Sequence, residues 1–336
     1  MKIGLFCLSE NYSGNVQESI MEQLRLVELA DELGFDEVWF AEHHFNAFSV
    51  IPDPAAMIGY AAGRTGSIRL GTAGFLTPFY HPVRLAETIA ILDNISEGRL
   101  NAGFAKGGFA PDTKHFSRDP NELRALMFET VEVIDDLLHN ITPTSYQGKY
   151  MEFNTVRIQP KPLQKKVPFF VATFANPETI RFAAHRGYGL LMSQGATLEE
   201  CLEGQKLYFS IAGVNPEIVL MRVFCIADSA EVAYSISRPC IDHFVKCMRA
   251  ASSDIPPPKF NREQYDAILT EREAFFDGQK FFDNGIIGTP EDCLKTINTI
   301  RKELPNVHLI LKPSSSDPGQ NRLMLSQFNT QIRPYI

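Results

Sequence analysis

The chain has 336 residues, of which 44% are hydrophobic and 21% are charged, a composition typical of a globular protein with a large buried core. The formal net charge of −8 and the lack of any basic cluster argue against nucleic acid as a partner. Six scattered cysteines without a C-x-x-C pair, no signal peptide and no membrane-length apolar run together predict a cytoplasmic protein that binds neither zinc nor membrane.

Apolar runs of strand type alternate with amphipathic helical segments along the chain. The expected strands are 3–8, 38–41, 68–76, 100–105, 167–172, 189–192, 218–227 and 307–311. The expected helices are 17–33, 55–62, 81–95, 121–138, 177–186, 198–211, 230–250 and 290–304. Eight strands alternating with helices, with no linker-like change of composition, predict an α/β fold: one (β/α)8 TIM barrel domain over residues 1–336.

Two stretches interrupt this alternation. Residues 141–166 contain Gly148 and three prolines, and we expect a hairpin there. Residues 251–285 contain three consecutive prolines and a phenylalanine-rich tail. They are too long for an ordinary connection, so we expect an insertion that acts as a mobile lid over the barrel mouth.

The second strand ends in three adjacent ionisable residues, Glu42, His43 and His44. In a TIM barrel the carboxyl ends of the strands carry the chemistry, so these side chains are the first candidates for catalysis. Adjacent side chains cannot all point the same way, so at most two of the three can share a pocket. The alternative is structural: a glutamate and two histidines that cap a strand and bond to nearby backbone.

Two further strand ends suggest an anion site. Asn176 precedes a proline and Thr179 at a helix start, where backbone N–H groups bind phosphate readily. Lys106 ends the fourth strand and would add a positive charge. Ordinary helix capping and a solvated lysine are the alternative interpretation.

Apolar and aromatic side chains dominate the remaining strand ends. They suit a flat cofactor together with a small apolar substrate, although ordinary core filling explains them equally well. A metal site is less favoured, because strands four to six end without Asp, Glu or His partners. The aromatic residues are Phe6, Phe45, Phe48, Phe75, Phe79, Phe104 and Phe109.

Several stretches, in order and near the family spacing, resemble the bacterial luciferase family of flavin-dependent monooxygenases. They are Gly34-Phe35-Asp36, Val38-Trp39, Glu42-His43-His44-Phe45, Gly71-Thr72-Ala73, His81-Pro82-Val83-Arg84, Glu87, Leu92-Asp93, Ser96, Gly98-Arg99 and Gly288-Thr289-Pro290-Glu291. The resemblance covers most of the chain and implies a barrel that binds reduced flavin mononucleotide (FMN) in its mouth.

The resemblance assigns roles to individual residues. His43 falls on the family's general acid/base, and we include its neighbours Glu42 and His44 in the catalytic set. Ala73-Gly74 falls on a non-proline cis peptide beneath the flavin ring. The implied cofactor contacts are Ala73, Gly74, Lys106, Thr173, Phe174, Asn176, Thr179, Met192 and Ser193. The implied substrate contacts are Phe6, Phe45, Phe75, Phe109 and Gln194.

Some positions depart from the luciferase pattern. Ala105 replaces the reactive cysteine, Gln194 replaces a tryptophan, and Lys106 replaces an arginine that contacts the flavin phosphate. Thr173 and Phe174 replace a Glu-Ser pair at the phosphate. The helix start at 176–179 is two residues longer than in luciferase and resembles that of non-luminous relatives, so we do not expect light emission.

The hypothesis from the sequence is a two-component monooxygenase that uses reduced FMN and O2, through a C4a-peroxyflavin, to oxygenate a small apolar substrate. A separate flavin reductase supplies the cofactor, because no G-x-G-x-x-G motif follows a strand in this chain. The family also implies a homodimer or a heterodimer, and we expect a homodimer. Alternatives are a deazaflavin (F420)-dependent hydride-transfer enzyme, a non-catalytic flavin-binding protein and a metal-dependent barrel hydrolase.

Overall fold

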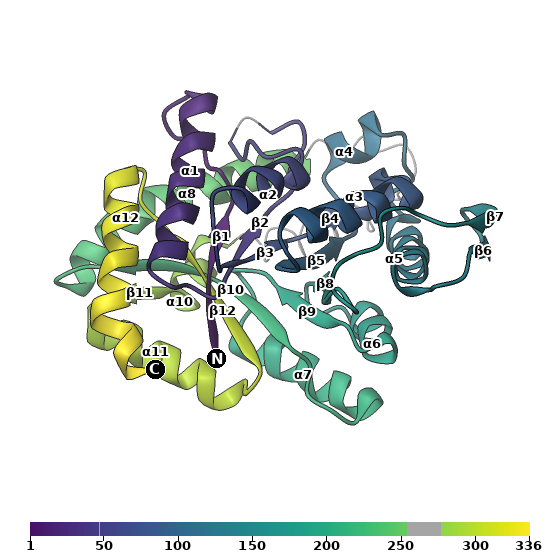
Figure 1. Ribbon diagram of the computed structural model, residues 1–336. Helices are drawn as coiled ribbons and strands as arrows, with labels where there is room; N and C mark the ends of the chain where they lie inside the picture. Colours follow the sequence, from purple (N-terminus) through teal and green to yellow (C-terminus); the bar gives the residue numbers. More distant parts are fainter. Residues whose placement is uncertain (47, 254–276) are drawn as a thin grey trace.

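Parallel strands form a closed ring in the computed structural model, which describes residues 1–46, 48–253 and 277–336 (Figure 1). The ring pairs β12 back to β1 and so has no open edge. Its strands are β1 (Lys2–Cys7), β2 (Glu37–Phe40), β3 (Arg69–Thr72), β5 (Leu100–Ala105), β8 (Phe169–Thr173), β9 (Gly189–Met192), β10 (Ile218–Ile226) and β12 (Val307–Pro313). The prediction of a (β/α)8 barrel is confirmed.

Helices surround this ring and cover its outer face (Figure 1). Several begin where the sequence provides a capping side chain: Thr197 and Thr289 each form a reciprocal capping box. The helices are α1 (Val16–Glu32), α2 (Pro54–Ala62), α3 (Pro82–Ile95), α5 (Leu123–His139), α6 (Pro177–Arg186), α7 (Leu198–Ala212), α8 (Ala230–Ser253), α11 (Pro290–Glu303) and α12 (Pro318–Gln327). Short η2 (Phe328–Ile332) and η3 (Arg333–Tyr335) follow α12.

The third predicted strand, 68–76, is not continuous. It divides into β3 and β4 (Phe75–Leu76), followed by the 3-10 turn η1 (Thr77–Phe79). The break falls at Ala73–Gly74, where the backbone turns toward the barrel mouth. A second feature, the short helix α4 (Ala110–His115), follows β5 and was not predicted.

The two interrupting stretches have different outcomes. The expected hairpin is confirmed as antiparallel β6 (Thr144–Gln147) and β7 (Glu152–Val156). The expected lid lies mainly at 254–276, outside the described residues. Its described end forms α10 (Gly278–Asp283), followed by β11 (Ile286–Gly288), which pairs with β10 outside the ring.

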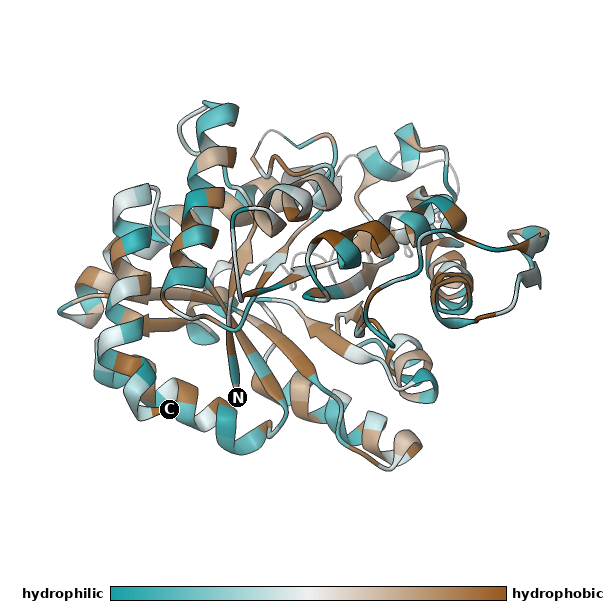
Figure 2. Cartoon of the chain, viewed as in Figure 1, coloured by the Kyte–Doolittle hydropathy of each residue, from teal (hydrophilic) through white to brown (hydrophobic). Residues whose placement is uncertain are grey.

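Apolar side chains alternate between two layers along each strand. Leu5, Val38 and Leu309 face the helices, whereas Phe6, Trp39 and Ile310 face the barrel interior. The strands are accordingly coloured mostly as hydrophobic in Figure 2, and polar residues gather on the helices. The interior is a packed core with space for chemistry only at its ends.

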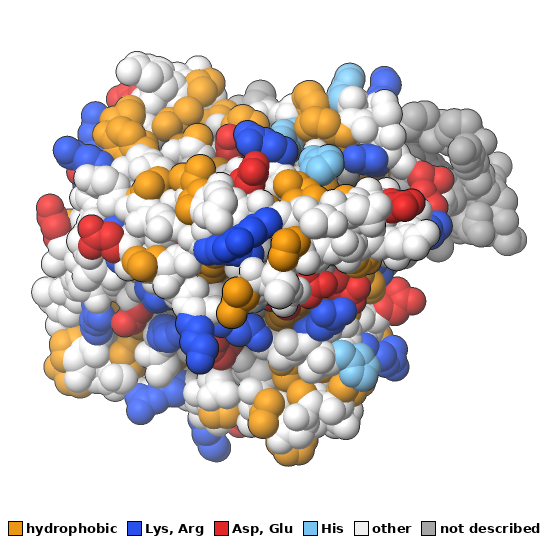
Figure 3. All heavy atoms as spheres, turned by 45° about the vertical axis from the view of Figure 1, so that its right-hand side comes forward, with side chains coloured by type: hydrophobic (Ala, Val, Ile, Leu, Met, Phe, Trp, Pro, Cys, Tyr) orange, Lys and Arg blue, Asp and Glu red, His pale blue; other side chains and the backbone are white. Residues whose placement is uncertain are grey.

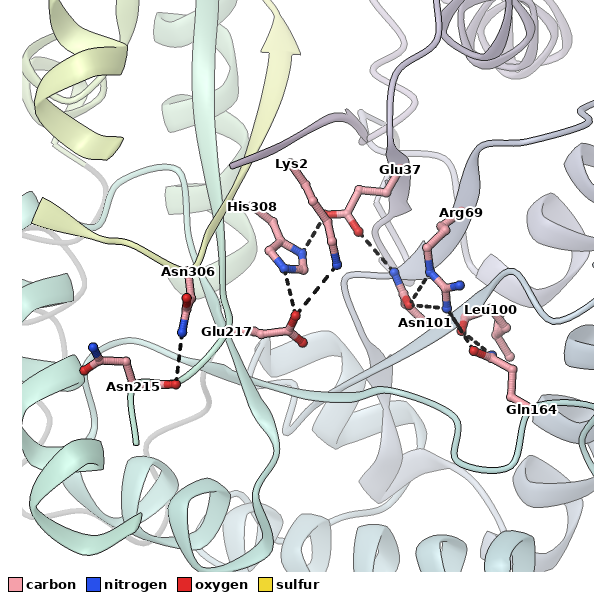
Figure 4. Close-up of polar contacts among 10 residues, drawn as sticks. All are labelled: Lys2, Glu37, Arg69, Leu100, Asn101, Gln164, Asn215, Glu217, Asn306 and His308. Atoms are coloured by element: carbon pink, nitrogen blue, oxygen red, sulfur yellow. Dashed lines mark hydrogen bonds and ion pairs between the residues drawn. The ribbon is translucent and has the colours of Figure 1, made fainter. Parts of the chain in front are cut away.

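A polar network occupies the amino-terminal end of the barrel, which we call the floor (Figure 4). His308 Nδ1 lies 2.8 Å from Glu37 Oε1, and His308 Nε2 lies 3.4 Å from Glu217 Oε1. The Asn101 amide donates to Glu37 Oε2 at 3.1 Å and accepts from Arg69 Nε at 3.0 Å. Each of these buried charges therefore has a partner inside the protein.

Candidate active site

Glu42 and His44 form a pair that holds the loop after β2. His44 Nε2 lies 2.8 Å from Glu42 Oε1, and Glu42 Oε2 accepts hydrogen bonds from the Leu76 N–H at 3.2 Å and the Tyr80 hydroxyl at 2.9 Å. The Glu42 carboxylate thereby ties this loop to β4 and η1. The structure gives Glu42 and His44 a supporting position around His43, as the geometry of adjacent residues requires.

His43 makes none of these bonds through its ring. Its backbone N–H donates to the Ile51 carbonyl at 2.8 Å, which fixes the main chain. Its imidazole packs against Phe109, with ring centroids 5.7 Å apart. Burial, together with the charge of His44, lowers the pKa of His43 to about 4, so its imidazole is neutral at pH 7.

The neighbouring groups titrate in the opposite direction. Burial alone would lower the pKa of His44, but its hydrogen bond to Glu42 and the charge of that carboxylate outweigh burial and raise it. Burial raises the pKa of Glu42 although His44 and Tyr80 act to lower it. The site thus places the neutral imidazole of His43 beside a hydrogen-bonded imidazole–carboxyl pair.

Asp112, on α4, completes this cluster and was not predicted. It is fully buried, and neither carboxylate oxygen has a hydrogen-bond partner among the described residues. Burial raises its pKa to about 6, with His44 lowering and Glu42 raising it. Its sequence signal was weak, because a single aspartate after a proline ordinarily serves as a helix cap.

Aromatic contacts attach α4 to the loop after β2. Phe116 lies edge-on to His44 with centroids 5.0 Å apart, and His115 lies 4.7 Å from Phe45. Phe45 has 59% of its surface exposed, so in this structure it packs on α4 at the rim instead of lining the mouth. Phe109 is the residue that α4 brings to His43.

The peptide bond between Ala73 and Gly74 is cis, as the resemblance implied. The Ala73 N–H donates to the Phe40 carbonyl at 2.7 Å, and Ala73 packs against the inner layer. A β-carbon added at Gly74 would lie 2.6 Å from the Gly103 and Phe104 backbone, so no side chain fits. Gly74 therefore packs directly against the backbone of β5, and we call the Ala73–Gly74 backbone the ledge.

The amino terminus of α6 has the features of an anion site. The Asn176 side chain accepts from the Thr179 N–H at 3.1 Å, and the Thr173 hydroxyl accepts from the Asn176 N–H at 3.0 Å. Arg124, on α5, was missed by the sequence analysis; it donates to the Thr179 hydroxyl at 2.7 Å, and its Nε lies 3.4 Å from Glu178 Oε2 in the first turn of α6. No local motif marks Arg124, since only the packing of α5 on α6 brings it here.

The other two residues predicted to contact an anion are Lys106 and Phe174. Lys106 Nζ donates to the adjacent Gly107 carbonyl at 3.2 Å, and Phe174 has 61% of its surface exposed. Phosphate recognition by this chain would therefore combine the α6 backbone with the charges of Arg124 and Lys106. A phenylalanine side chain can contribute only a main-chain contact.

Three predicted residues lie at the ends of β9 and β1. Ser193 Oγ and Gln194 Oε1 are buried without a hydrogen-bond partner among the described residues, so they are open to a ligand. The Ser193 carbonyl accepts from Arg222 Nη1 at 3.4 Å, which steadies this loop. Phe6 is buried in the inner layer.

Two residues that were predicted as contacts have side chains in the outer layer. Phe75 is fully buried in the outer layer, where it lies edge-on to Tyr80. Met192 also faces the outer layer, because Leu191 takes the inward position on β9. Neither side chain reaches the mouth, because strand alternation directs both toward the helices.

The described residues contain no group of three His, Cys, Asp or Glu that could hold a metal ion. No helix in that part of the chain is long and apolar enough to cross a membrane. The mouth instead combines a glycine ledge, buried polar atoms without a described partner, and a helix start at which Arg124 and Glu178 form an ion pair.

The fold is a TIM barrel whose second strand leads to a neutral histidine, His43. The chain belongs to the luciferase-like monooxygenase family, whose sequence profile matches residues 1–305. It is 27% identical over 318 residues to the alkanal monooxygenase alpha chain of Photobacterium leiognathi, covering 89% of this chain and 88% of the relative. It is 28% identical over 243 residues to the oxygenase component of the flavin-dependent trigonelline monooxygenase of Acinetobacter baylyi, covering 69% and 67%.

Solved structures give the same result. Monooxygenase RslO1 from Streptomyces bottropensis superposes with a TM-score of 0.85 at 27% identity, over 100% of this chain and 99% of that chain. The oxygenating constituent of 3,6-diketocamphane monooxygenase from Pseudomonas putida, in complex with FMN, has a TM-score of 0.79 at 20% identity over the same shares, and shares the fold. An F420-dependent secondary alcohol dehydrogenase shares the fold at 21% identity and a TM-score of 0.72, over 99% of this chain and 98% of that one.

Proposed function

We propose that this chain is the oxygenase component of a two-component system that uses reduced FMN and O2 to oxygenate a small organic substrate. The observation that carries the proposal is the neutral, desolvated His43 held beside the Ala73–Gly74 ledge in a luciferase-like barrel. A neutral imidazole can accept a proton and return it near pH 7, as general acid–base chemistry requires.

The residues of the mouth would divide the work. The Ala73–Gly74 ledge would support one face of the flavin ring, with Ser193 and Gln194 offering polar atoms at its edge. Arg124, Lys106 and the start of α6 would hold the phosphate. When bound, reduced FMN supplies the activation of O2. His43 would exchange the proton, while Glu42 and His44 fix its position.

Water exclusion is the other contribution of the chain. Phe109 and Phe6 place apolar surface around His43 and the inner layer. A dry mouth strengthens electrostatic interactions and protects reactive species from water. The lid predicted at residues 251–285 would complete this enclosure.

A separate reductase is the partner that this proposal requires. The trigonelline relative is named as an oxygenase component, which supports a two-component arrangement. We also place the protein in the cytoplasm, because all six cysteines are free thiols. On the face drawn in Figure 3, basic and acidic side chains are interspersed, as suits a small-molecule enzyme.

We further propose a homodimer that forms through α2 and α3. Tyr60 on α2 and Ile91 and Ile95 on α3 are large apolar side chains with 44%, 49% and 50% of their surface exposed. Neighbouring helices present them together, and a second copy would cover them by a self-complementary contact. Sedimentation of wild type and of Tyr60→Glu/Ile91→Glu tests this: the variant should sediment as a monomer, and a dimeric variant would contradict the interface.

Rapid mixing tests the function itself. Protein loaded with reduced FMN is mixed with aerated buffer, and flavin reoxidation and O2 uptake are followed. We expect the bound flavin to reoxidise clearly more slowly than free reduced FMN. A compound that the enzyme oxygenates should accelerate this reoxidation. Tight binding of a reduced deazaflavin without O2 uptake would instead establish the hydride-transfer alternative, and binding of flavin without any turnover would establish the non-catalytic one.

A further inference from the structure

A buried ion pair lies at the end of β12, on the opposite side of β1 from β2 and His43. Lys312 is 2% exposed, and its Nζ lies 2.5 Å from Glu10 Oε1. Alternation along β12 turns Lys312 inward, because Ile310 belongs to the inner layer and Leu309 and Leu311 to the outer one. Lys312 therefore introduces a charge at the mouth of an otherwise apolar inner layer, directly opposite Val223 of β10.

The backbone around Glu10 is held in place. Glu10 and Ser49 form an isolated antiparallel bridge, and the Asn11 N–H donates to the Phe48 carbonyl at 2.7 Å. These bonds join the loop after β1 to the loop that carries His43. Glu10 is consequently a fixed part of the mouth, and its carboxylate cannot withdraw freely into solvent.

A cavity of about 200 Å³ opens beside this pair. Its inner end is lined by Phe6, Glu10, Tyr12 and Lys312, and its outer end by residues of α1 and α12. The Tyr12 hydroxyl is buried, and burial together with the charge of the nearby Glu10 raises the pKa of this phenol. The cavity thus joins the apolar inner layer to a donor, an acceptor and a buried hydroxyl.

The charges limit what can bind there. Lys312 and Glu10 neutralise each other, so an added carboxylate or ammonium group would leave a net charge in a low-dielectric site. A neutral hydroxyl can accept from the ammonium and donate to the carboxylate at once, leaving both satisfied. Phe6 and Tyr12 line the cavity and favour an aromatic body. Phe48, which does not line the cavity, packs edge to face on Tyr12 at 5.4 Å and holds that ring in place.

We propose that this cavity is the substrate subsite of the enzyme and that it selects neutral phenolic compounds, whose hydroxyl bridges Lys312 and Glu10. This inference rests on the proposed monooxygenase function and specifies its substrate class. The sequence analysis expected a small apolar substrate; the proposed subsite adds one polar group to it, the phenolic hydroxyl.

Calorimetric titration of the flavin-free protein with three probes tests the subsite. The probes are 2-naphthol, its methyl ether and 2-naphthoate, at pH 7. We expect 2-naphthol to bind about tenfold or more tightly than the ether, because a hydrogen bond to a charged group is lost in the ether. 2-Naphthoate should bind more weakly than 2-naphthol. Emission of Trp39, the only tryptophan, reports independently on occupation of the barrel interior.

Variants attribute the preference to the ion pair. Lys312→Met should reduce the naphthol-to-ether ratio to about threefold or less, because the donor is lost. The double variant Glu10→Gln/Lys312→Met removes both charges and should do the same without leaving a buried carboxylate alone. Arg322→Met is the matched control, because Arg322 pairs with Glu22 at the outer end of the same cavity, and its ratio should stay that of wild type.

Three outcomes would overturn the subsite: equal affinity of wild type for naphthol and ether, a preference that persists in both Lys312 variants, or tighter binding of 2-naphthoate than of 2-naphthol. These titrations contain no flavin. Reduced FMN binding by the same preparations is measured separately, so that failure of the proposed function and failure of the phenolic subsite give different results.

Discussion

The two ends of the barrel treat buried polar groups in opposite ways. At the floor, Glu37, Asn101 and His308 all find partners within the chain (Figure 4). At the mouth, Asp112, Ser193 and Gln194 keep atoms that no described residue satisfies. An unpartnered buried polar atom costs free energy, which makes these atoms candidates for contacts with a ligand. We therefore assign the floor to the stability of the fold and propose the mouth as the functional site.

The largest expected effect is the loss of turnover when His43 is replaced. In His43→Ala the imidazole that exchanges the proton is lost, so turnover should fall by about 10²- to 10⁴-fold while flavin binding persists. His185→Ala, an exposed histidine on α6, is the control and should turn over like wild type. Steady-state turnover rates with saturating reduced FMN test this role. An undiminished rate in His43→Ala would show that His43 does not take part in the mechanism.

The floor should respond through stability instead. Glu37→Ala leaves His308 and Asn101 without their shared partner, and we expect a loss of about 3–5 kcal/mol in the free energy of unfolding. Glu28→Ala breaks only the surface pair with Arg64 and should cost less than about 1 kcal/mol. Denaturant unfolding measures both. Equal losses in the two variants would mean that the floor network is not a stabilising element.

Replacement of Asp112 should increase stability, in contrast to replacement of Glu37. Its pKa is raised from 3.8 to about 6, so stability present below pH 4 is lost as pH rises through 6. Asp112→Asn should therefore be more stable than wild type by about 1–3 kcal/mol above pH 6, and the difference should vanish below pH 4. Unfolding across this pH range tests it. A variant less stable than wild type at pH 8 would show that Asp112 has a partner.

The smallest effect is the pH dependence of the floor. Burial alone would lower the pKa of His308, but the hydrogen bonds with Glu217 and Glu37 raise it. Its contribution is full below the ordinary histidine pKa and is lost as pH rises through the raised value. The hydrogen bond to His308 lowers the pKa of Glu217, whose contribution is lost as pH falls through that value. In His308→Gln the free energy of unfolding should change less steeply with pH around both pKa values. If unfolding experiments show the same pH dependence as wild type, the His308–Glu217 pair does not cause it.

The sequence predicted the barrel well because each strand and helix is short, regular and marked by local signals. Alternation and caps located the eight strands, and the motif around His43 located the mouth. The residues that were missed, Asp112, Arg124 and Lys312, carry no local signal, because each acquires its role from a neighbour far away in the chain. The outward orientation of Phe75 and Met192 was not predicted for a related reason: inward or outward orientation depends on the register of each strand, which a one-residue shift reverses.

The most direct test of the account is an anaerobic titration of the protein with reduced FMN. The account predicts saturable binding by wild type, about tenfold or more weaker binding by Arg124→Met, which loses a charge-assisted contact with the phosphate, and unchanged binding by the surface variant Arg64→Met. Failure of wild type to bind reduced FMN, or equal affinity in all three proteins, would contradict the assignment of the mouth and of α6 as the flavin site.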